Sequence, residues 1–577
     1  MEFFFQIDKS TLMPDLKRSG KIKPDIVEVD SKWSYLKKSG NDWMIWVGDF
    51  VRESSTSSPE IMMEKLLTTK QFDVAEIIKT GGVFYCIHYI HKDQKIRVLT
   101  GFLNILPIYY YQEGETLFVS SSAKMLADHC KTMPSVSYQF LVEKLLFNYP
   151  FTEKSIYQGI TSLEGNHFLE INSQGFSGRK HTNIDDWIVT NPKPVKSALP
   201  DLTNYFNERV ANYFPDEEYY LSFTSGFDGR TLLSAALNKS TPLIAYSFGV
   251  SQCDDIMLPT SQSAKLGITF HPFQLDKDEY LKQSYELGLE LVESSEGLSN
   301  LARAHYLYAA SLIGKKHNYI VTGNFGSELF RAFRVTGVMV TPFLFKLFTH
   351  PDPKEFLNKY PFTELDVLNN EVVNTVLPEL KNDLLSSEYL QTSSFTQNQR
   401  FYKIVFEIVF RKYFGAEIKA QSKHVLNRTP FIDYEFLKRI FRSELAGQYT
   451  DFYESNPAKR MKGQMLYANI IRNNSEKLYK LKTGKGYRPS DLLSLTGKIN
   501  LLKGKFTRKF KQGIADEFGV RKALEYNRSI IEQATINQQI FKKDIRKESV
   551  PNDNLLLNNY INVLSLNHFI NNFTPNG

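Results

Sequence analysis

Residues 219–237, YYLSFTSGFDGRTLLSAAL, decide the fold of the larger part of the chain. A hydrophobic and aromatic run at 219–223 predicts a strand, the small residues at 224–226 predict a tight turn, and 230–237 favours a helix. This order places backbone N–H groups and the positive end of a helix dipole around one anion-sized space. Asp228 adds a carboxylate, which suits a phosphate that arrives with Mg²⁺. An ordinary strand-to-helix connection, with a glycine for close packing, explains this turn alone equally well.

The sequence that follows alternates between strand and helix patterns. Strands are predicted at 241–248, 268–275 and 319–321, and helices at 258–266, 278–291 and 301–313. This alternation predicts an α/β domain with a doubly wound parallel sheet, which binds ligands beyond the carboxyl ends of its strands. A second glycine-containing turn, at 322–328, also follows a strand, so both turns are expected to face one crevice.

The first 180 residues have a different pattern, with short apolar runs bounded by Gly, Asn and Asp. Strands are predicted at 43–47, 83–90, 95–100, 108–111 and 117–120, with a hairpin turn at 113–115 and helices at 62–67 and 138–147. We therefore expect an α+β domain: a sandwich of antiparallel sheets with flanking helices.

Length and composition limit the number of domains and the class of protein. A chain of 577 residues is too long for one core, and a segment with three prolines at 185–203 marks the boundary. The net charge of +7 does not by itself indicate nucleic acid, and three separated cysteines exclude a disulfide framework or a Cys-based zinc site. No signal sequence or apolar stretch long enough to span a bilayer is found, so a cytoplasmic protein is expected. The expected division is a domain at 1–185, a linker at 186–203, a second domain at 204–495 and a basic helical extension at 496–577.

Several motifs resemble the asparagine synthetase family in the same order. The stretches GGVFYCIHYI, LPIYYYQEGETLFVSSSAKML and ITSLEGNHFLEINSQGF resemble its N-terminal domain, which has the Ntn-hydrolase fold. TSGFDG at 224–229 is similar to its pyrophosphate loop "SGGxDS", and TGNFGSELF at 322–330 to "G(E/D)GxDELF". RTPFID at 428–433 matches "RVPFLD", and KGYRP at 485–489 matches "K.GF..P". The resemblance covers roughly residues 40–490 and implies an ATP-pyrophosphatase (PP-loop) domain.

The resemblance implies ATP and Mg²⁺ as cofactors and assigns roles to individual residues. Positions matching the pyrophosphate cradle are Thr224, Ser225, Gly226 and Gly229, with Asp228 as a Mg²⁺ ligand. Positions matching the adenine, ribose and backbone contacts to the nucleotide are Phe223, Ser247, Phe248, Thr322 and Gly323. Lys485 matches the family's catalytic lysine. Lys482 lies only three residues away, so the alignment does not decide which of the two lysines occupies the catalytic position.

The chain departs from the family at specific positions. Ser225 replaces a loop glycine, and Gly229 replaces the final serine. Ser327 replaces the second metal-binding aspartate, which leaves Glu328 as the nearest carboxylate. Asn324 replaces a glutamate beside the incoming nucleophile, which suits an amine other than ammonia. The family's glutaminase needs an N-terminal cysteine; residue 2 is Glu2, and no "NGEIYN"-like segment is found, so the first domain is expected to be degenerate and structural.

The expected function is an ATP-dependent amide-forming ligase, like the glutaminase-lacking lasso-peptide cyclases and β-lactam synthetase. It would adenylate a carboxylate, release pyrophosphate and AMP, and use ammonia or an amine on a small metabolite, peptide or glycan. The resemblance is also compatible with a homodimer. The alternatives are a glutamine-hydrolysing asparagine synthase in asparagine biosynthesis and a non-catalytic nucleotide-binding scaffold.

Three features remain outside this assignment. The apolar stripe of the helix predicted at 397–414 favours core packing over a binding groove. Arg428 either binds a phosphate or carboxylate or fixes the turn before Pro430, with equal weight. The basic run at 498–511 favours a solvated helix face over binding to an acidic polymer or membrane, and residues 552–577 are apolar enough for a packed terminal helix.

Overall fold

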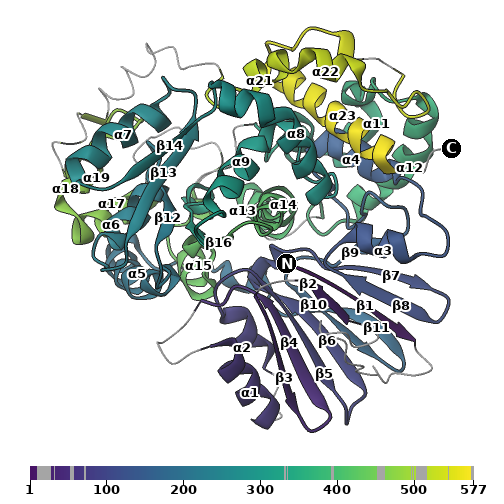
Figure 1. Cartoon of the computed structure of the whole chain (residues 1–577), viewed down its shortest axis with the longest axis horizontal. Coiled ribbons are helices and arrows are strands. Elements are labelled where there is room, and N and C mark those ends of the chain that lie inside the picture. Colours follow the sequence, from purple (N-terminus) through teal and green to yellow (C-terminus); the bar gives the residue numbers. More distant parts are fainter. Residues whose placement is uncertain are drawn as a thin grey trace.

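The computed structural model has an N-terminal part built on antiparallel sheets and a larger part built on a parallel sheet (Figure 1). The structure describes residues 1–8, 27–30, 33–51, 58–69, 73–330, 333, 336–391, 395–450, 452, 462–494, 497, 500–501, 516–542 and 545–573. Most of the basic run predicted near residue 500, including Lys498, Lys503 and Arg508, lies outside these residues.

Two antiparallel sheets form the N-terminal part. The first has the order β2-β1-β8-β7-β9 and consists of β1 (Glu2–Asp8), β2 (Val27–Asp30), β7 (Tyr109–Glu113), β8 (Thr116–Ser120) and β9 (Thr161–Ser162). The second has the order β11-β10-β6-β5-β4-β3 and consists of β3 (Ser34–Ser39), β4 (Asp42–Gly48), β5 (Phe84–Ile90), β6 (Lys95–Thr100), β10 (His167–Asn172) and β11 (Gly175–Lys180).

The central strands of the six-stranded sheet, such as β4 and β5, are buried on both faces. Side chains alternate along each strand, so Ile45 lies in the core shared with the other sheet, whereas Trp46 and Cys86 lie on the opposite face. Helices α1 (Pro59–Thr69) and α2 (Val74–Lys79) cover that opposite face (Figure 1). The predicted sandwich of antiparallel sheets with flanking helices is confirmed.

The larger part contains a five-stranded parallel sheet. Its order is β14-β13-β12-β15-β16, and it consists of β12 (Tyr219–Ser222), β13 (Leu243–Gly249), β14 (Phe270–Gln274), β15 (Tyr319–Val321) and β16 (Leu426–Arg428). Strands β13 and β14 extend to one side of β12, and β15 and β16 to the other. The order reverses between β12 and β15, and α/β sheets bind ligands at such a reversal.

Helices cover both faces of the parallel sheet. On one face, Leu221 shares a core with Leu232 of α6 (Asp228–Ala236). On the other face, Tyr220 shares a core with residues of α8 (Asp278–Ser294) and α9 (Ala304–Ile313). The parallel α/β sheet predicted from the alternating pattern is therefore present.

A long helical segment fills the space between the two parts. It consists of α13 (Gln397–Ile404), a π-helix (Val405–Phe414) and α14 (Gly415–Gln421). The predicted core role of this segment is confirmed, but it also buries charges: Arg411 pairs with Glu153 of the N-terminal part at 2.5 Å. Buried charges are tolerated when they are paired in this way.

The remaining helices surround these layers. They are α3 (Ala123–His129), α4 (Tyr138–Phe147), α5 (Val195–Val210), α7 (Asp254–Leu266), α10 (Pro342–Thr349), α11 (Pro353–Lys359), α12 (Asn370–Ser386), α15 (Tyr434–Phe441), α17 (Lys462–Asn474), α18 (Glu476–Lys480), α19 (Pro489–Leu493), α21 (Val520–Tyr526), α22 (Arg528–Gln533) and α23 (Asn554–Phe573). The predicted terminal helix corresponds to α23, which buries apolar residues against the core.

Helix α5 begins at Val195, inside the segment expected to be irregular, although Pro200 lies within it. Ala198, Leu202, Phe206 and Val210 are buried and recur every four residues, so they form one apolar stripe on the helix. Packing of this stripe outweighs the hydrogen bond that Pro200 cannot donate.

Arg428 joins the two parts of the molecule. Its Nε and Nη2 donate to the two carboxylate oxygens of Asp49 at 2.8 and 2.9 Å, and its guanidinium lies 4.5 Å from the ring centroid of Tyr319. Both charged side chains are buried. The carboxylate that Arg428 binds therefore belongs to the protein itself.

Replacing Arg428 by methionine is expected to lower the free energy of unfolding by about 3–5 kcal/mol, because Asp49 would remain buried without its partner. Denaturant unfolding measures this. Arg439→Met is the control, since that arginine is exposed and pairs with Asp201 at 3.4 Å; its effect should stay below about 1 kcal/mol. Equal effects for the two variants would contradict the account, and Asp49→Leu combined with Arg428→Met should recover much of the loss.

Lys144 on α4 is a buried cation whose Nζ donates to the carbonyl of Leu298. Burial lowers the pKa of Lys144 to about 7, and the nearby Glu417 partly opposes this shift. The unfolded chain, with an ordinary lysine pKa, therefore binds more protons than the folded chain above pH 7. The contribution of Lys144 to the free energy of unfolding therefore rises with pH, from about pH 7 up to the ordinary pKa of lysine.

The difference in unfolding free energy between wild type and Lys144→Met should therefore change in favour of wild type by about 1 kcal/mol per pH unit above pH 7. Denaturant unfolding at pH 7.5, 8.5 and 9.5 measures it. The exposed Lys154 provides a control variant, Lys154→Met, with no such trend. A pH-independent difference for Lys144→Met would show that the lysine stays charged.

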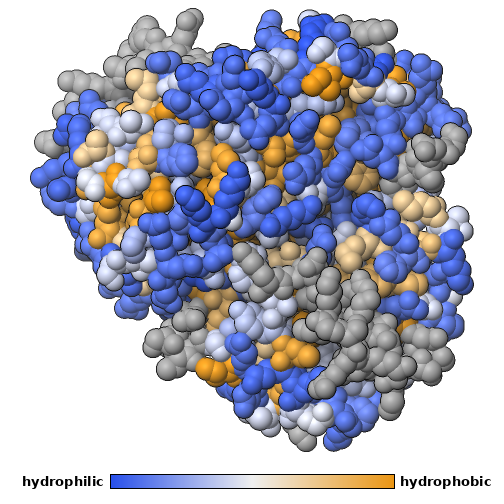
Figure 2. Space-filling view, viewed as in Figure 1, coloured by the Kyte–Doolittle hydropathy of each residue, from blue (hydrophilic) through white to orange (hydrophobic). Residues whose placement is uncertain are grey.

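The visible face in Figure 2 is mostly hydrophilic, and its hydrophobic residues form small patches separated by polar ones. Among the described residues, none of the helices has the length and apolar character needed to span a bilayer.

Candidate nucleotide site

The two glycine-containing turns meet at the reversal point of the parallel sheet. Strands β12 and β15 are parallel neighbours in which Leu221 is paired with Val321, so their carboxyl ends lie side by side. A Cβ placed on Gly323 would lie 2.8 Å from Cβ of Asp228 and 2.9 Å from the backbone nitrogen of Gly229. Such contacts are too short for any side chain, so Gly323 is what allows the turns to touch.

The two glycines of the first turn have different roles. A Cβ on Gly229 would lie 2.2 Å from the carbonyl oxygen of Ser222, so this glycine is required for packing of α6 against β12. At Gly226 a Cβ would meet only Thr224 Oγ1, at 3.3 Å, so the space above Gly226 is open. Helix α6 begins at Asp228, and its N-cap residue, Phe227, makes no side-chain capping hydrogen bond. This open end is where the sequence predicts a phosphate.

An internal carboxylate already reaches this turn. The backbone N–H of Ser225 donates to Asp255 Oδ1 at 2.9 Å, and that of Gly226 donates to Thr224 Oγ1 at 3.2 Å. Asp255 lies in the first turn of α7, which begins at Asp254, earlier than predicted. Two acidic residues in a first helical turn are a start signal that the prediction at 258–266 overlooked. A phosphate bound at Ser225 has to replace Asp255.

The loop that contains both candidate lysines lies directly on the first turn. The N–H of Gly484 donates to the carbonyl of Ser225 at 3.0 Å, and Lys485 Nζ lies 5.5 Å from the ring centroid of Phe227. The side chain of Lys482 is exposed, and its carbonyl accepts a hydrogen bond from Gln262 at 2.7 Å. The structure thus brings the Lys485 ammonium to the turn, whereas Lys482 contributes its backbone.

Two of the candidate metal ligands, Asp228 and Glu328, act electrostatically on the same buried side chain. Burial raises the pKa of the Tyr467 phenol well above its ordinary value, and the charges of Asp228 and then Glu328 raise it further. Ser327 Oγ donates to Glu328 Oε1 at 2.7 Å. The described residues contain no cluster of three or more acidic, His or Cys side chains suited to a metal. Two carboxylates and a hydroxyl suit Mg²⁺ held jointly with phosphate oxygens.

The other predicted positions line the strand ends. Phe223 and Ser247 are buried, and no partner is found for Ser247 Oγ among the described residues. Phe248 packs against His305 and Phe518, at ring-centroid distances of 4.5 and 6.3 Å.

On the β15 side, two predicted positions follow the strand end. Thr322 Oγ1 donates to Asn427 Oδ1 at 2.8 Å, so its side chain fastens β15 to β16. Asn324 is partly exposed in the turn beyond. The prediction that these residues share the crevice with the first turn is consistent with this placement.

Burial disfavours the thiolate form of all three cysteines. Cys86 is buried in β5, and burial raises its pKa well above that of an ordinary thiol. Burial also raises the pKa of Cys130 and of Cys253. A thiol attacks as the thiolate, so these environments disfavour covalent chemistry.

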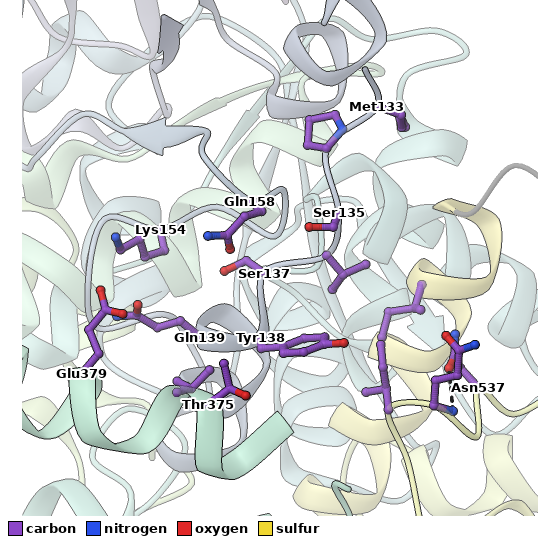
Figure 3. A pocket seen from close by; sticks show the side chains of 16 residues that line it. Met133, Ser135, Ser137, Tyr138, Gln139, Lys154, Gln158, Thr375, Glu379 and Asn537 are labelled. Atoms are coloured by element: carbon purple, nitrogen blue, oxygen red, sulfur yellow. Dashed lines mark hydrogen bonds between the residues drawn. The ribbon is translucent and has the colours of Figure 1, made fainter. Parts of the chain in front are cut away.

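A separate cavity of about 610 Å³ lies between the N-terminal part, α12 and residues 537–540 (Figure 3). Lys154 and Glu379 lie at one side of it and Asn537 at the other, with Tyr138 between them. None of the residues predicted to bind nucleotide lines this cavity.

Comparison with known proteins identifies the class of the N-terminal part. Residues 52–182 match the family model described as a glutamine amidotransferase domain. This segment of the chain is therefore similar to a glutamine amidotransferase domain. The match spans strands of both antiparallel sheets, from β5 to β11, and does not extend into the parallel sheet.

Among solved structures, the chain matches glutamine phosphoribosylpyrophosphate (PRPP) amidotransferase from B. subtilis complexed with ADP and GMP. The match has 13% sequence identity and a TM-score of 0.16, and it covers 41% of this chain and 47% of that chain. The match thus spans about half the length of that protein. No curated protein matches the chain.

Proposed function

We propose that the chain is an ATP-dependent amide-forming ligase of the asparagine synthetase type that lacks its own glutaminase. The observation that carries this proposal is the contact of Gly323 with Asp228 and Gly229 at the reversal of the parallel sheet, beneath the loop of Lys485. The amidotransferase domain in the N-terminal part supports it, since it precedes the parallel sheet in the order expected. The proposal also includes the domain division expected from the sequence: domains at 1–185 and 204–495, a linker at 186–203 and an extension at 496–577.

The first step would join a substrate carboxylate to AMP. A carboxylate oxygen attacks the α-phosphorus of ATP, and the bond to the bridging oxygen breaks as pyrophosphate leaves. The open space above Gly226 and the uncapped N-terminus of α6 would hold the pyrophosphate. Lys485 would offset charge at the α-phosphate. Asp228 and Glu328, with Ser327, would hold Mg²⁺, which supplies positive charge to the leaving group.

The second step would form the amide. The lone pair of an amine or ammonia attacks the acyl carbon, the nitrogen loses a proton, and AMP leaves. The residue on the nucleophile side is Asn324, which is neutral and suits a substrate amine. The raised thiol pKa values argue against a glutaminase as the nitrogen source.

The test is incubation with ATP, Mg²⁺ and a panel of carboxylates, with hydroxylamine as a general amine. Hydroxylamine converts any acyl-adenylate into a hydroxamate, so the natural amine need not be known. We expect AMP, pyrophosphate and hydroxamate in equal amounts, without glutamine. Formation of ADP and phosphate would contradict the proposal.

A non-catalytic nucleotide-binding scaffold is the second candidate. The carboxylate of Asp255 at the Ser225 N–H favours it, because this contact competes with a bound phosphate. ATP binding without turnover across the whole panel would support the scaffold, and Asp255→Asn should then bind ATP more tightly.

A further inference from the structure

Arg230 is an arginine fully removed from water at the start of α6. It follows Asp228 by two positions, its exposed fraction is 0%, and burial lowers its pKa to about 10. Arginine is almost never buried completely unless its charge and donors are used. The contacts of Arg230 should therefore explain why the chain keeps it there.

The hydrogen bonds of Arg230 connect three segments: α6, α7 and the loop that begins at Lys482. Arg230 Nη2 donates to Gln262 Oε1 of α7 at 2.8 Å and to the carbonyl of Lys482 at 3.3 Å. The amide of Gln262 donates to the same carbonyl at 2.7 Å. The guanidinium also lies 5.5 Å from the ring centroid of Phe223. One backbone carbonyl at the start of the lysine loop thus accepts two hydrogen bonds from buried side chains.

The rest of the loop has fixed geometry. The N–H and hydroxyl of Thr483 both donate to the carbonyl of Tyr487, at 3.0 and 2.8 Å, and Gly486 adopts a positive φ of 82°. The N–H of Gly484 donates to Ser225 as described above. These hydrogen bonds close the loop on itself, so its position on the turn depends on how its two ends are attached.

We propose that Arg230 and Gln262 are positioning residues that hold the loop of residues 482–487 on the turn of residues 224–229 and so fix where Lys485 presents its charge. The catalytic role of Lys485 in this inference rests on the proposed function. The attachment of the loop to the turn rests on the hydrogen bonds alone. Holding a charged group in place before reaction removes the entropy loss of ordering it in the transition state.

The first test is hydrogen–deuterium exchange of peptides that cover residues 481–488. In Arg230→Met and in Gln262→Met, exchange at Gly484 and Gly486 should be faster by about tenfold, because the loop loses its attachment at Lys482. Arg230→Lys should fall between wild type and Arg230→Met. Because this readout needs no turnover, it stands even if the proposed function fails.

Arg303→Met is the matched control. Arg303 is a half-buried arginine paired with Glu417 at 2.5 Å, and its hydrogen-bond partners among the described residues, Glu417 and Tyr306, lie outside the lysine loop. The control should lower overall stability and leave exchange at 481–488 unchanged. Hydrogen exchange of the loop that is unchanged in Arg230→Met would overturn the inference. An increase in exchange that is equally large in β12 and α9 would also overturn it, because Arg230 would then stabilise the core as a whole and not the loop.

The second test uses the reaction itself. In Arg230→Met, kcat for pyrophosphate release should fall by about 10- to 100-fold, while KM for ATP changes less than about threefold. A rise in KM with unchanged kcat would overturn a positioning role.

Discussion

Pyrophosphate release from ATP is expected to fall by about 100-fold or more when Asp228 is replaced by alanine. Asp228 begins α6 and lies against Gly323 of the second turn. Removing it takes away the metal ligand predicted at the point where the two turns meet. A radiometric assay of pyrophosphate release, with circular dichroism to verify folding, measures the effect.

Asp278→Ala is the control for this prediction. Asp278 also begins a helix, α8, but it is exposed and belongs to neither turn. Its variant should keep wild-type turnover. If Asp228→Ala retained more than about a tenth of wild-type activity, Asp228 would not be the metal ligand.

The second large effect distinguishes the two candidate lysines. Lys485→Ala should lower kcat by about 100-fold or more, because the Lys485 ammonium lies beside the turn at Phe227. Lys482→Ala should change kcat by less than about threefold, because the contact that Lys482 makes with Gln262 uses its backbone carbonyl. Steady-state kinetics of both variants, with equilibrium binding of ATP, gives the comparison.

The reverse result, with Lys482→Ala inactive and Lys485→Ala active, would contradict the geometry described here. Loss of ATP binding in Lys485→Ala would also change the assignment, because the lysine would then serve ground-state binding. Lys477→Ala, on α18, is a suitable control for the change of charge.

The elements with strong periodicity were predictable from the sequence. The strand at 95–100 and the helix at 138–147 occur at the residues predicted, because alternating or helical apolar spacing is a local property. Helix α5 begins inside the segment predicted to be a linker, because the prolines there were given more weight than the buried stripe from Ala198 to Val210. Helix α7 begins earlier than predicted, because the acidic start at Asp254 was overlooked.

The contacts that position the site were not predictable in the same way. Arg428 and Asp49 are 379 residues apart, and Gln262 and Lys482 are 220 apart. A single sequence gives no signal for such pairs, because each residue also occurs in ordinary solvated positions. Arg230 gave a weak hint, since a charged residue among the apolar positions of α6 must find partners inside the protein.

The meeting of the two turns was predicted in outline. The meeting of the two turns follows from strand order, which the alternation of strands and helices indicates. The carboxylate of Asp255 at Ser225 does not follow from it, because it depends on where the first turn of α7 lies.

We propose that the turns at 224–229 and 322–328 hold one ATP molecule between them. A crystal structure of the chain with α,β-methylene-ATP and Mg²⁺ tests this arrangement. We expect the phosphates within hydrogen-bonding distance of Gly226 and the first turn of α6, on the side facing Gly323, with Lys485 beside the α-phosphate. An analogue bound elsewhere, such as in the cavity beside Tyr138, or an Asp228 side chain turned away from the phosphates, would contradict it.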